Sequence, residues 1–209
     1  MYEYNNYIDS IIKNLDSINK SDLKIQILRL IEERNHLLEI VKKDTLTGAY
    51  NRRILNYINN FSVVVLCDVD DFKCINDTYG HDVGDNVLKV VTKILMNNTR
   101  ENDIVCRYGG DEFLVIFNKC SKDLVKKRMD IVSKIIKDYF KNLNINVSFS
   151  AGISSYEEGK TLDEIIKEAD IALYESKNNG KSGISIYDKN SKVYKKNSKW
   201  KLFLEKKIC

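Results

Sequence analysis

Residues 103–117 read DIVCRYGGDEFLVIF, two apolar runs joined by a Gly-Gly-Asp turn. Such a turn between apolar runs is typical of a β-hairpin. We therefore predict strands at residues 103–108 and 112–117 that face each other. The turn also carries two acids, Asp111 and Glu112, beside glycines that let a ligand approach the backbone closely.

Outside the hairpin, strand and helix patterns alternate along the chain. Short apolar runs and helical periodicity predict strands at 62–69, 146–154 and 183–187, and helices at 46–59, 72–77, 84–98, 121–141 and 161–179. Such alternation around one antiparallel hairpin indicates an α/β or α+β fold, in which helices wrap a mainly antiparallel sheet.

The N-terminal residues 1–43 read as helical, with a polar break at residues 19–21 where Ser21 is suited to cap a second helix. About three heptads of apolar residues follow, the shortest pattern typical of a coiled coil. Two interpretations stay open: a dimerising, signalling coiled coil, or a helical hairpin packed on the domain that follows. The apolar positions are Leu23, Ile27, Leu30, Leu37 and Val41.

The composition is typical of a soluble globular chain, with 209 residues, 43% apolar and 31% charged. The length suits one domain and an accessory segment. The net charge of +4 is too small to indicate binding to nucleic acid or an anionic membrane by itself. No run approaches the ~18 apolar residues of a membrane span, and the start lacks the features of a signal peptide. We therefore expect a cytoplasmic protein without a nucleic-acid partner or a membrane span.

The five cysteines show no metal-binding spacing. Because Cys67 and Cys106 lie inside apolar strand patterns, buried reduced thiols are expected. The C-terminal residues 191–209 form a lysine-rich tail. A tail of this kind is usually solvated, although it also resembles the start of a linker to a further module.

Acidic residues follow the apolar run 63–67, at Asp68 and Asp70. These two carboxylates share a face if the strand continues that far, and a buried acid is costly unless something neutralises it. Together with Asp111 and Glu112 they form a set of oxygen ligands suited to Mg²⁺ or Mn²⁺. Two such ions, ~3.5–4 Å apart, are the usual device for phosphoryl or nucleotidyl transfer. The alternative is that these acids are solvated turn residues.

Residues 107–113, RYGGDEF, resemble the signature of the GGDEF family of diguanylate cyclases. The family's other motifs resemble residues 44–53, 68–85 and 169–177, in the same order. The resemblance covers roughly residues 44–187 and implies a polymerase-palm-like sheet of five strands wrapped by helices. It therefore assigns residues 44–190 to a cyclase domain, between the N-terminal helical segment and the basic tail.

The resemblance also implies the metal ligands and the catalytic residues. Asp68, the Val69 carbonyl and Asp111 would hold two Mg²⁺ or Mn²⁺ ions per active site. Glu112 would coordinate metal or assist deprotonation of the 3′-hydroxyl. Lys73 would join Asp111 and Glu112 as a catalytic residue by supplying positive charge to the triphosphate.

The implied substrate is GTP. Asn76 and Asp85 would read guanine, because an amide and a carboxylate match the pattern of N–H donors on guanine. Adenine does not offer that donor pair. The backbone N–H groups around Phe72 and Lys73, at a helix N-terminus, would cradle the β- and γ-phosphates. Lys177 would add positive charge to the triphosphate.

Lys181 departs from the family pattern, because many members have a phosphate-binding arginine at this position. A lysine keeps the charge but loses the two-pronged geometry of a guanidinium. We therefore expect Lys181 to contact the triphosphate and to bind it more weakly than an arginine would.

Each domain of this family binds one GTP, so the reaction implies a homodimer. Each 3′-hydroxyl attacks the α-phosphate of the opposite GTP, which yields cyclic di-GMP and two pyrophosphates. Arg100 and Asp103 match the family's RxxD site, where the product inhibits the enzyme; the alternative is a surface loop with an incidental ion pair. Rival functions are a catalytically weak or inactive receptor for cyclic di-GMP or GTP, a dimerisation module, and a cyclase for another nucleotide.

Overall fold

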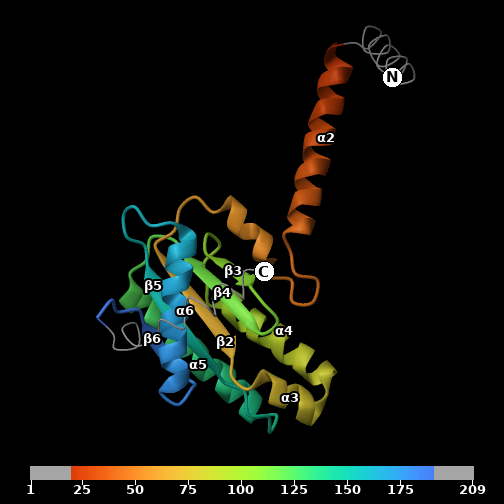
Figure 1. Ribbon diagram of the computed structural model, residues 1–209. Helices are drawn as coiled ribbons and strands as arrows, with labels where there is room; N and C mark the ends of the chain where they lie inside the picture. The colour runs from red at the N-terminus through yellow and green to blue at the C-terminus, as the bar shows by residue number, and fades with distance from the viewer. Residues whose placement is uncertain (1–19, 191–209) are drawn as a thin grey trace, which may run out of the picture. The chain divides into compact units, whose positions relative to one another are not determined.

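The computed structural model describes residues 20–190. The chain divides into two compact units, residues 1–43 and residues 44–209. In the first unit the described element is α2 (Lys20–Val41) (Figure 1). The earlier helix predicted at the N-terminus and the predicted tail at 191–209 lie outside the described residues.

The described part of helix α2 starts at Lys20, so the backbone of Ser21 lies within the helix. Its apolar side chains are largely exposed, including those of Ile27, Leu30, Leu37 and Val41 from the predicted stripe. An exposed apolar helix face of this kind is available for packing against another helix.

The second unit is built on a six-stranded sheet with the strand order β1-β3-β4-β2-β5-β6. The three inner pairs are antiparallel, and the outer pairs β1–β3 and β5–β6 are parallel. The mainly antiparallel sheet is therefore confirmed, with one strand more than the five expected. The strands are β1 (Tyr50–Asn51), β2 (Val63–Val69), β3 (Ile104–Arg107), β4 (Glu112–Phe117), β5 (Phe149–Ser155) and β6 (Ile184–Ile186).

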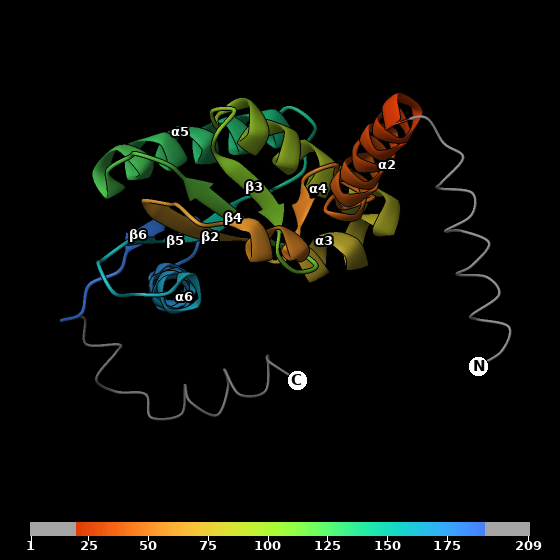
Figure 2. The same ribbon diagram turned by 90° about the horizontal axis from the view of Figure 1, so that it is seen from above.

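Helices cover both faces of this sheet, with α4 and α5 on one side and α6 on the other (Figure 2). Ser121 caps α5, and Thr161 forms a capping box with Glu164 at the start of α6, as their residue types favour. The helices of this unit are α3 (Phe72–Tyr79), α4 (His81–Asn97), α5 (Lys122–Lys141), α6 (Leu162–Asn178) and a 3₁₀ helix, η1 (Arg52–Tyr57).

The core has two layers, separated by the sheet. On β2, Val63, Val65 and Cys67 belong to the apolar cluster beneath α4 and α5, whereas Val64 and Leu66 belong to the cluster beneath α6. This alternation is the side-chain period of a β-strand. Because Val64 and Leu66 face α6, the same alternation directs the side chain of Asp68 toward α6.

Gly152 on β5 allows α6 to approach the sheet closely. A Cβ at this position would lie 2.0 Å from the carbonyl oxygen of Ala169 and 2.2 Å from the amide nitrogen of Leu173. Because both of these atoms belong to the backbone, they cannot move aside as a flexible side chain can. Gly152 therefore determines how closely α6 packs against the sheet. This packing also positions Lys177 in the last turn of α6 and Lys181 just after it.

The helix predicted at residues 46–59 is wrong. Asp44 Oδ1 accepts hydrogen bonds from the amide and the hydroxyl of Thr47, and Gly48 has a φ of 74°. Tyr50 and Asn51 then pair with β3, which leaves only the short helix η1. The turn chemistry of an Asp side chain and the pairing of a distant strand outweigh the local apolar periodicity.

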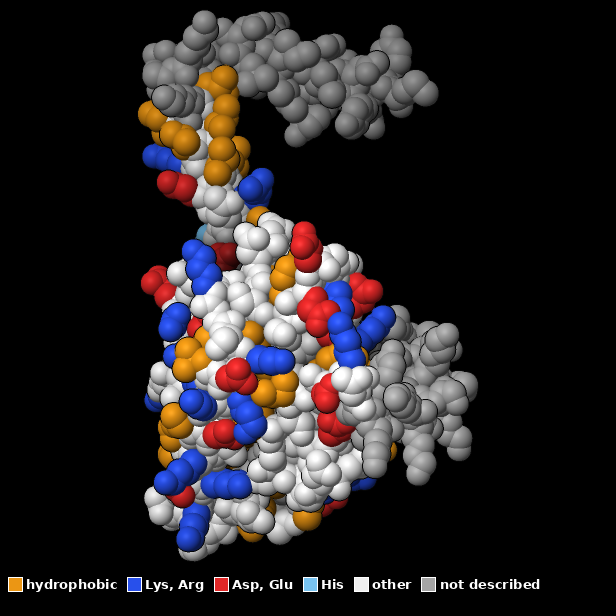
Figure 3. Space-filling model, turned by 90° about the vertical axis from the view of Figure 1, so that its left-hand side faces the viewer, with side chains coloured by type: hydrophobic (Ala, Val, Ile, Leu, Met, Phe, Trp, Pro, Cys, Tyr) orange, Lys and Arg blue, Asp and Glu red, His pale blue; other side chains and the backbone are white. Residues whose placement is uncertain are grey.

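Both strand cysteines, Cys67 and Cys106, are buried free thiols, as predicted. Burial raises the pKa of the Cys106 thiol to about 12. Figure 3 shows that basic side chains (Lys and Arg) and acidic side chains (Asp and Glu) are interspersed over one face of the second unit. Between residues 20 and 190, no helix is both long enough and apolar enough to cross a membrane.

Candidate functional site

The C-terminal end of β2 brings together three of the four predicted acids, Asp68, Asp111 and Glu112, whereas the fourth, Asp70, is hydrogen-bonded by serines instead. Asp68 pairs in register with Glu112 of β4, and the Val69 amide donates to the carbonyl oxygen of Asp111, 3.2 Å away. Directly opposite residues of an antiparallel pair point to the same side of a sheet. Strand pairing therefore places Asp68, Val69, Asp111 and Glu112 at the same end of the sheet, although more than forty residues separate the two segments along the chain.

Asp68 is a partly buried acid in a field of like charges. Burial raises its pKa above the ordinary range, and Lys177 Nζ, 2.6 Å from Asp68 Oδ1, opposes that shift. The charges of Asp111 and Glu112 raise the pKa further. The Asp68 side chain is only 14% exposed. The cluster thus gathers three carboxylates beside the Lys177 ammonium group, and such a concentration of negative charge favours a bound cation.

The donor set fits a divalent cation by chemistry. Carboxylate and carbonyl oxygens are the ligands that Mg²⁺ and Mn²⁺ prefer. Among the residues described, however, no group of three or more His, Cys, Asp and Glu side chains is arranged to hold a metal ion. In this structure Lys177 engages an oxygen of Asp68, so its ammonium group supplies the compensating charge.

Arg107 holds the Gly-Gly-Asp turn in place. Its Nε and Nη2 atoms donate to the Gly110 carbonyl oxygen at 3.0 and 2.8 Å, and Nη1 donates to Asp44 Oδ1 at 3.2 Å. Burial opposes ionisation of Asp44, but the hydrogen bonds from Thr47 and the charge of Arg107 outweigh it, so the pKa of Asp44 lies below its ordinary value. Asp44 and Arg107 lie in segments that resemble family motifs, residues 44–53 and 107–113, but neither residue was predicted to belong to the site.

The predicted guanine readers lie on neighbouring helices, with Asn76 on α3 and Asp85 on α4. An added Cβ at Gly84 would lie 1.8 Å from Asn76 Oδ1. The Asn76 amide therefore occupies the space beside the α4 backbone that any side chain at residue 84 would fill. Asp85, the next residue, is exposed.

The N-terminus of α3 meets the segment after α6. Its N-cap residue Asp71 has a φ of 53° and makes no side-chain capping hydrogen bond. Phe72 and Lys73 form the first turn, and Lys73 is exposed. Lys181 Nζ lies 2.6 Å from Asp71 Oδ1, and this hydrogen bond raises the pKa of Lys181. Two of the three lysines predicted to contact the triphosphate, Lys177 and Lys181, therefore contact Asp68 and Asp71 respectively.

Arg100 and Asp103 lie at the other end of the sheet, apart from the acids. They border a pocket of about 650 Å³, which Phe61 and Tyr156 also line. Asp103 accepts hydrogen bonds from the Arg100 amide at 2.9 Å and from the Asn118 amide at 3.1 Å. Its carboxylate therefore shapes the loop that presents Arg100, a contribution that the sequence pattern did not indicate.

Residues 41–183, more than half of the chain, match the family described as "Diguanylate cyclase, GGDEF domain". The chain belongs to this GGDEF family. The match includes the acids at the end of β2, the Gly-Gly-Asp turn and the Arg100 loop, so the expected family membership is confirmed.

Named relatives and solved structures agree with this assignment. Diguanylate cyclase A of Treponema denticola is 39% identical over 131 residues, which are 61% of this chain and 35% of that protein. Diguanylate cyclase DosC of Escherichia coli is 29% identical over 213 residues, covering 88% of this chain and 46% of that protein. The chain thus spans less than half of the length of either relative.

The fold is similar to that of the coiled coil and GGDEF domain of DgcB from Caulobacter crescentus, which was solved in complex with c-di-GMP. The two structures superpose with a TM-score of 0.67 at 22% sequence identity, over 79% of this chain and 96% of the DgcB chain. This likeness confirms the expected GGDEF fold.

Proposed function

We propose that this chain is a diguanylate cyclase that condenses two GTP molecules into cyclic di-GMP and two pyrophosphates. The observation that carries the proposal is the convergence of Asp68, Asp111 and Glu112 at one end of the sheet, next to Lys177. Carboxylates beside a phosphate-binding surface are what metal-assisted nucleotidyl transfer requires.

GTP would bind along α3 and α4. Asn76 and Asp85 read the guanine edge, and leaving these polar groups unpaired disfavours adenine. The backbone N–H groups of Phe72 and Lys73 face the β- and γ-phosphates at the helix N-terminus. Lys73, Lys177 and Lys181 add positive charge around the triphosphate. The lack of a side-chain cap on α3 supports this placement.

Asp68, the Val69 carbonyl, Asp111 and Glu112 would hold two Mg²⁺ or Mn²⁺ ions. When bound, these ions offset the negative charge on the phosphate oxygens and favour loss of the 3′-hydroxyl proton. Glu112 accepts that proton, and Lys177 exchanges its contact with Asp68 for a triphosphate oxygen. Each 3′-hydroxyl then attacks the α-phosphate of the GTP on the opposite domain.

The reaction requires two domains, so the protein acts as a homodimer and α2 contributes to pairing through its exposed apolar residues. Leu30→Glu combined with Leu37→Glu should lower turnover most at low protein concentration, where dimer formation limits the rate. The exposed Glu33→Gln change on the same helix is the control. Equal turnover of all three proteins across a dilution series would contradict a role of α2 in pairing.

Product feedback acts at Arg100 and Asp103. A guanidinium group chelates phosphate and stacks on guanine, and the adjoining pocket of about 650 Å³ offers space for a nucleotide. The aromatic pair Phe61 and Tyr156, with ring centroids 5.4 Å apart, lies at the same pocket. Bound product lowers the rate from this distant site.

The test is to incubate purified protein with GTP and Mg²⁺ and to separate the nucleotides by chromatography. We expect cyclic di-GMP and pyrophosphate in the ratio of one to two, and no cyclic product from ATP. Absence of cyclic di-GMP at protein concentrations that give a dimer would contradict the proposal.

A catalytically weak or inactive receptor for cyclic di-GMP or GTP is the second candidate. It is favoured by one observation: the pocket at Arg100 shares no residue with the acid cluster, so binding there does not require turnover. Calorimetric binding of cyclic di-GMP by a protein that fails to convert GTP would identify this function.

A further inference from the structure

Asp70 is a buried carboxylate that the proposed reaction does not use. It follows β2 directly and is 6% exposed. Ser150 Oγ donates to its Oδ1 at 2.6 Å, and Ser148 Oγ donates to its Oδ2 at 2.6 Å. The Ser182 amide donates to Oδ2 at 3.0 Å. Because a buried polar group is stable only when its hydrogen-bonding capacity is met, these donors account for the burial of the Asp70 side chain.

The Ser182 amide belongs to a turn that does not form readily by itself. Lys181 and Ser182 have φ values of 62° and 55°, and two successive left-handed residues with side chains are unfavourable. Such a turn persists only when its surroundings hold it. The Ser182 amide also donates to Ser150 Oγ at 3.0 Å, so Asp70 and Ser150 form a common acceptor for the turn.

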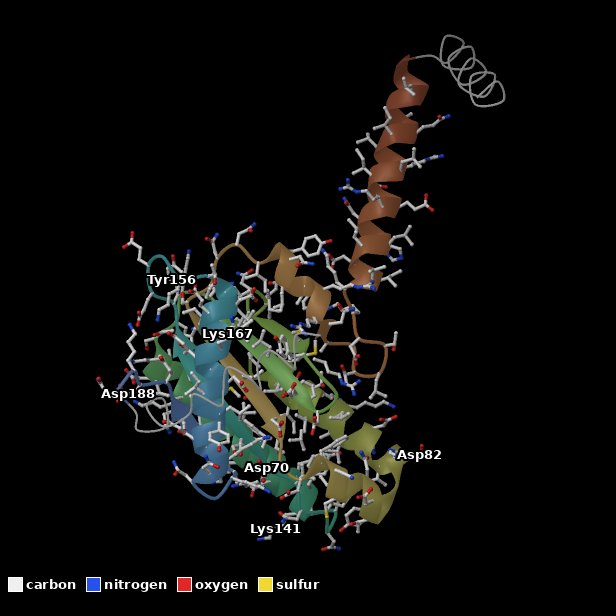
Figure 4. All side chains as sticks on the ribbon, viewed as in Figure 1. Asp70, Asp82, Lys141, Tyr156, Lys167 and Asp188 are labelled. Carbon is white, nitrogen blue, oxygen red and sulfur yellow. The ribbon has the colours of Figure 1, made fainter. Side chains whose placement is uncertain are left out.

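This turn carries Lys181 to the start of α3. Lys181 Nζ contacts Asp71, the residue after Asp70 and the N-cap of α3. Asp70 therefore joins the end of β2, strand β5 and the segment after α6. Figure 4 places Asp70 at this end of the sheet, near the C-terminal end of α6.

We propose that Asp70 is a positioning residue for the triphosphate of the nucleotide. Its carboxylate holds the turn at residues 181–182 so that Lys181 faces the phosphates at the N-terminus of α3. Asp70 itself does not touch the substrate. The inference rests on the proposed function, because it takes GTP as the ligand of α3. A lysine contacts phosphate through one nitrogen, so its effect depends on where the backbone presents it.

Strand β5 offers a matched pair of serines for the test. Ser150 and Ser154 are both buried and lie four residues apart, so they share a face of the strand. Each donates its hydroxyl to a carboxylate, Ser150 to Asp70 at 2.6 Å and Ser154 to Glu168 at 2.7 Å. Only the Ser150 network includes the Lys181 turn. The changes Ser150→Ala and Ser154→Ala therefore remove the same group from two different networks.

We expect Ser150→Ala to raise the KM for GTP about fivefold, the size of one partly exposed lysine–phosphate contact, with little change in kcat. Ser154→Ala should leave KM and kcat within a factor of two of the unmodified enzyme. The two serine variants should lower the melting temperature by similar amounts. An equal KM for the two variants would show that the Asp70 network serves stability alone and would overturn the proposal.

A double-mutant cycle tests whether Asp70 acts through Lys181. The full-length variants are Asp70→Asn, Lys181→Ala and the two changes combined. If Asp70 acts through Lys181, the combined variant binds a GTP analogue with a methylene bridge between the α- and β-phosphates no more weakly than Lys181→Ala does. Multiplied effects in calorimetric titrations would contradict the proposal. Should Asp70→Asn fail to fold, Ser150→Ala replaces it in the cycle.

The binding assay also separates this inference from the proposed reaction. If the unmodified protein forms no cyclic di-GMP but binds the analogue, and Ser150→Ala alone of the serine pair weakens that binding, the inference stands while the catalytic proposal fails. If the protein is active and the two serine variants bind the analogue equally, the inference fails while the catalytic proposal stands. Binding of guanosine, which lacks phosphates, should be the same for both variants.

Discussion

Strand β2 carries Asp68 near its C-terminal end and is followed by Asp70, whereas its N-terminal end lies beside the pocket of Arg100. Figure 4 marks these two ends with Asp70 and Tyr156. At the first end, buried acids are compensated by partners from distant segments, such as Lys177 and Ser182. At the second end, polar groups are satisfied within a local loop, in which Asp103 accepts from the amides of Arg100 and Asn118.

The difference indicates how each end responds to change. The acid end concentrates like charge, so the loss of one group alters chemistry and electrostatics together. The pocket end is formed by loops at the ends of paired strands, so its side chains can change while the strands remain in place. Substitutions at the two ends should therefore separate the rate of the reaction from its control.

The largest effect is expected for Asp111→Asn at the acid end. The change removes a predicted metal ligand, and we expect the rate of cyclic di-GMP formation to fall by ~10³-fold. Chromatographic separation of the products of GTP turnover measures the rate. Glu158→Gln, which changes an exposed acid outside the acid cluster, is the control. A fall of less than tenfold would place the chemistry elsewhere.

A smaller effect is expected for Gly84→Ala. The new Cβ would collide with the Asn76 amide, which must swing away from the guanine edge. We expect the KM for GTP to rise by ~10-fold (about 1.4 kcal/mol). Because alanine favours a helix more than glycine does, the melting temperature should not fall.

Initial rates over a range of GTP concentrations, together with thermal unfolding, provide both measurements for Gly84→Ala. An unchanged KM for GTP would mean that Asn76 does not read the base. A fall in both KM and melting temperature would also count against this explanation.

The ion pair beneath the Gly-Gly-Asp turn predicts a dependence of stability on pH. Because the pKa of Asp44 is depressed in the folded protein, its carboxylate stabilises the fold above the unfolded-state pKa of about 3.9. This contribution is lost as pH falls through the lower, folded-state pKa. We expect Asp44→Asn to reduce the free energy of unfolding by about 1 kcal/mol at pH 7 and to have little effect below about pH 3.

Urea unfolding at a series of pH values measures the difference between Asp44→Asn and the unmodified protein. A difference that stays constant from neutral to acid pH would show that the Asp44 charge contributes nothing. Glu158→Gln again provides an exposed carboxylate for comparison.

The smallest effect on the uninhibited rate is expected for Arg100→Ala at the pocket end. The Arg100 side chain is exposed, and the loop is shaped by its backbone amide. The initial rate should therefore remain within a factor of two, while inhibition by added cyclic di-GMP is lost. Progress curves with and without added product test both statements. Inhibition that persists in the variant would remove Arg100 from the feedback site.

Much of the fold follows from local patterns. The hairpin, the long helices α5 and α6 and strand β2 carry strong periodicity and recognisable caps or turns, and the structure has them within a few residues of the predicted bounds. The helix predicted at residues 46–59 was wrong, because a side-chain turn at Asp44 and pairing of β1 with β3 determine that segment. Such pairing depends on residues more than fifty positions away.

The site was predicted less completely than the fold. The motifs predicted the acids and lysines of the site. They did not indicate that Lys177 contacts Asp68 or that Arg107 donates hydrogen bonds to the Gly110 carbonyl oxygen. The partners of Asp70 could not be predicted either, because the Ser182 amide is 112 residues away along the chain. Long-range contacts of this kind arise from the assembled sheet and leave no periodic signal in the sequence.

Gly152 has a consequence for how this protein tolerates sequence change. The residue has no side chain and takes no part in chemistry, yet helix α6, whose last turn carries Lys177, packs directly against its backbone. A methyl group there would lift α6 from the sheet and carry the lysine away from Asp68. In a library of random variants, position 152 should therefore behave like an active-site position, although it lies in the packed interior.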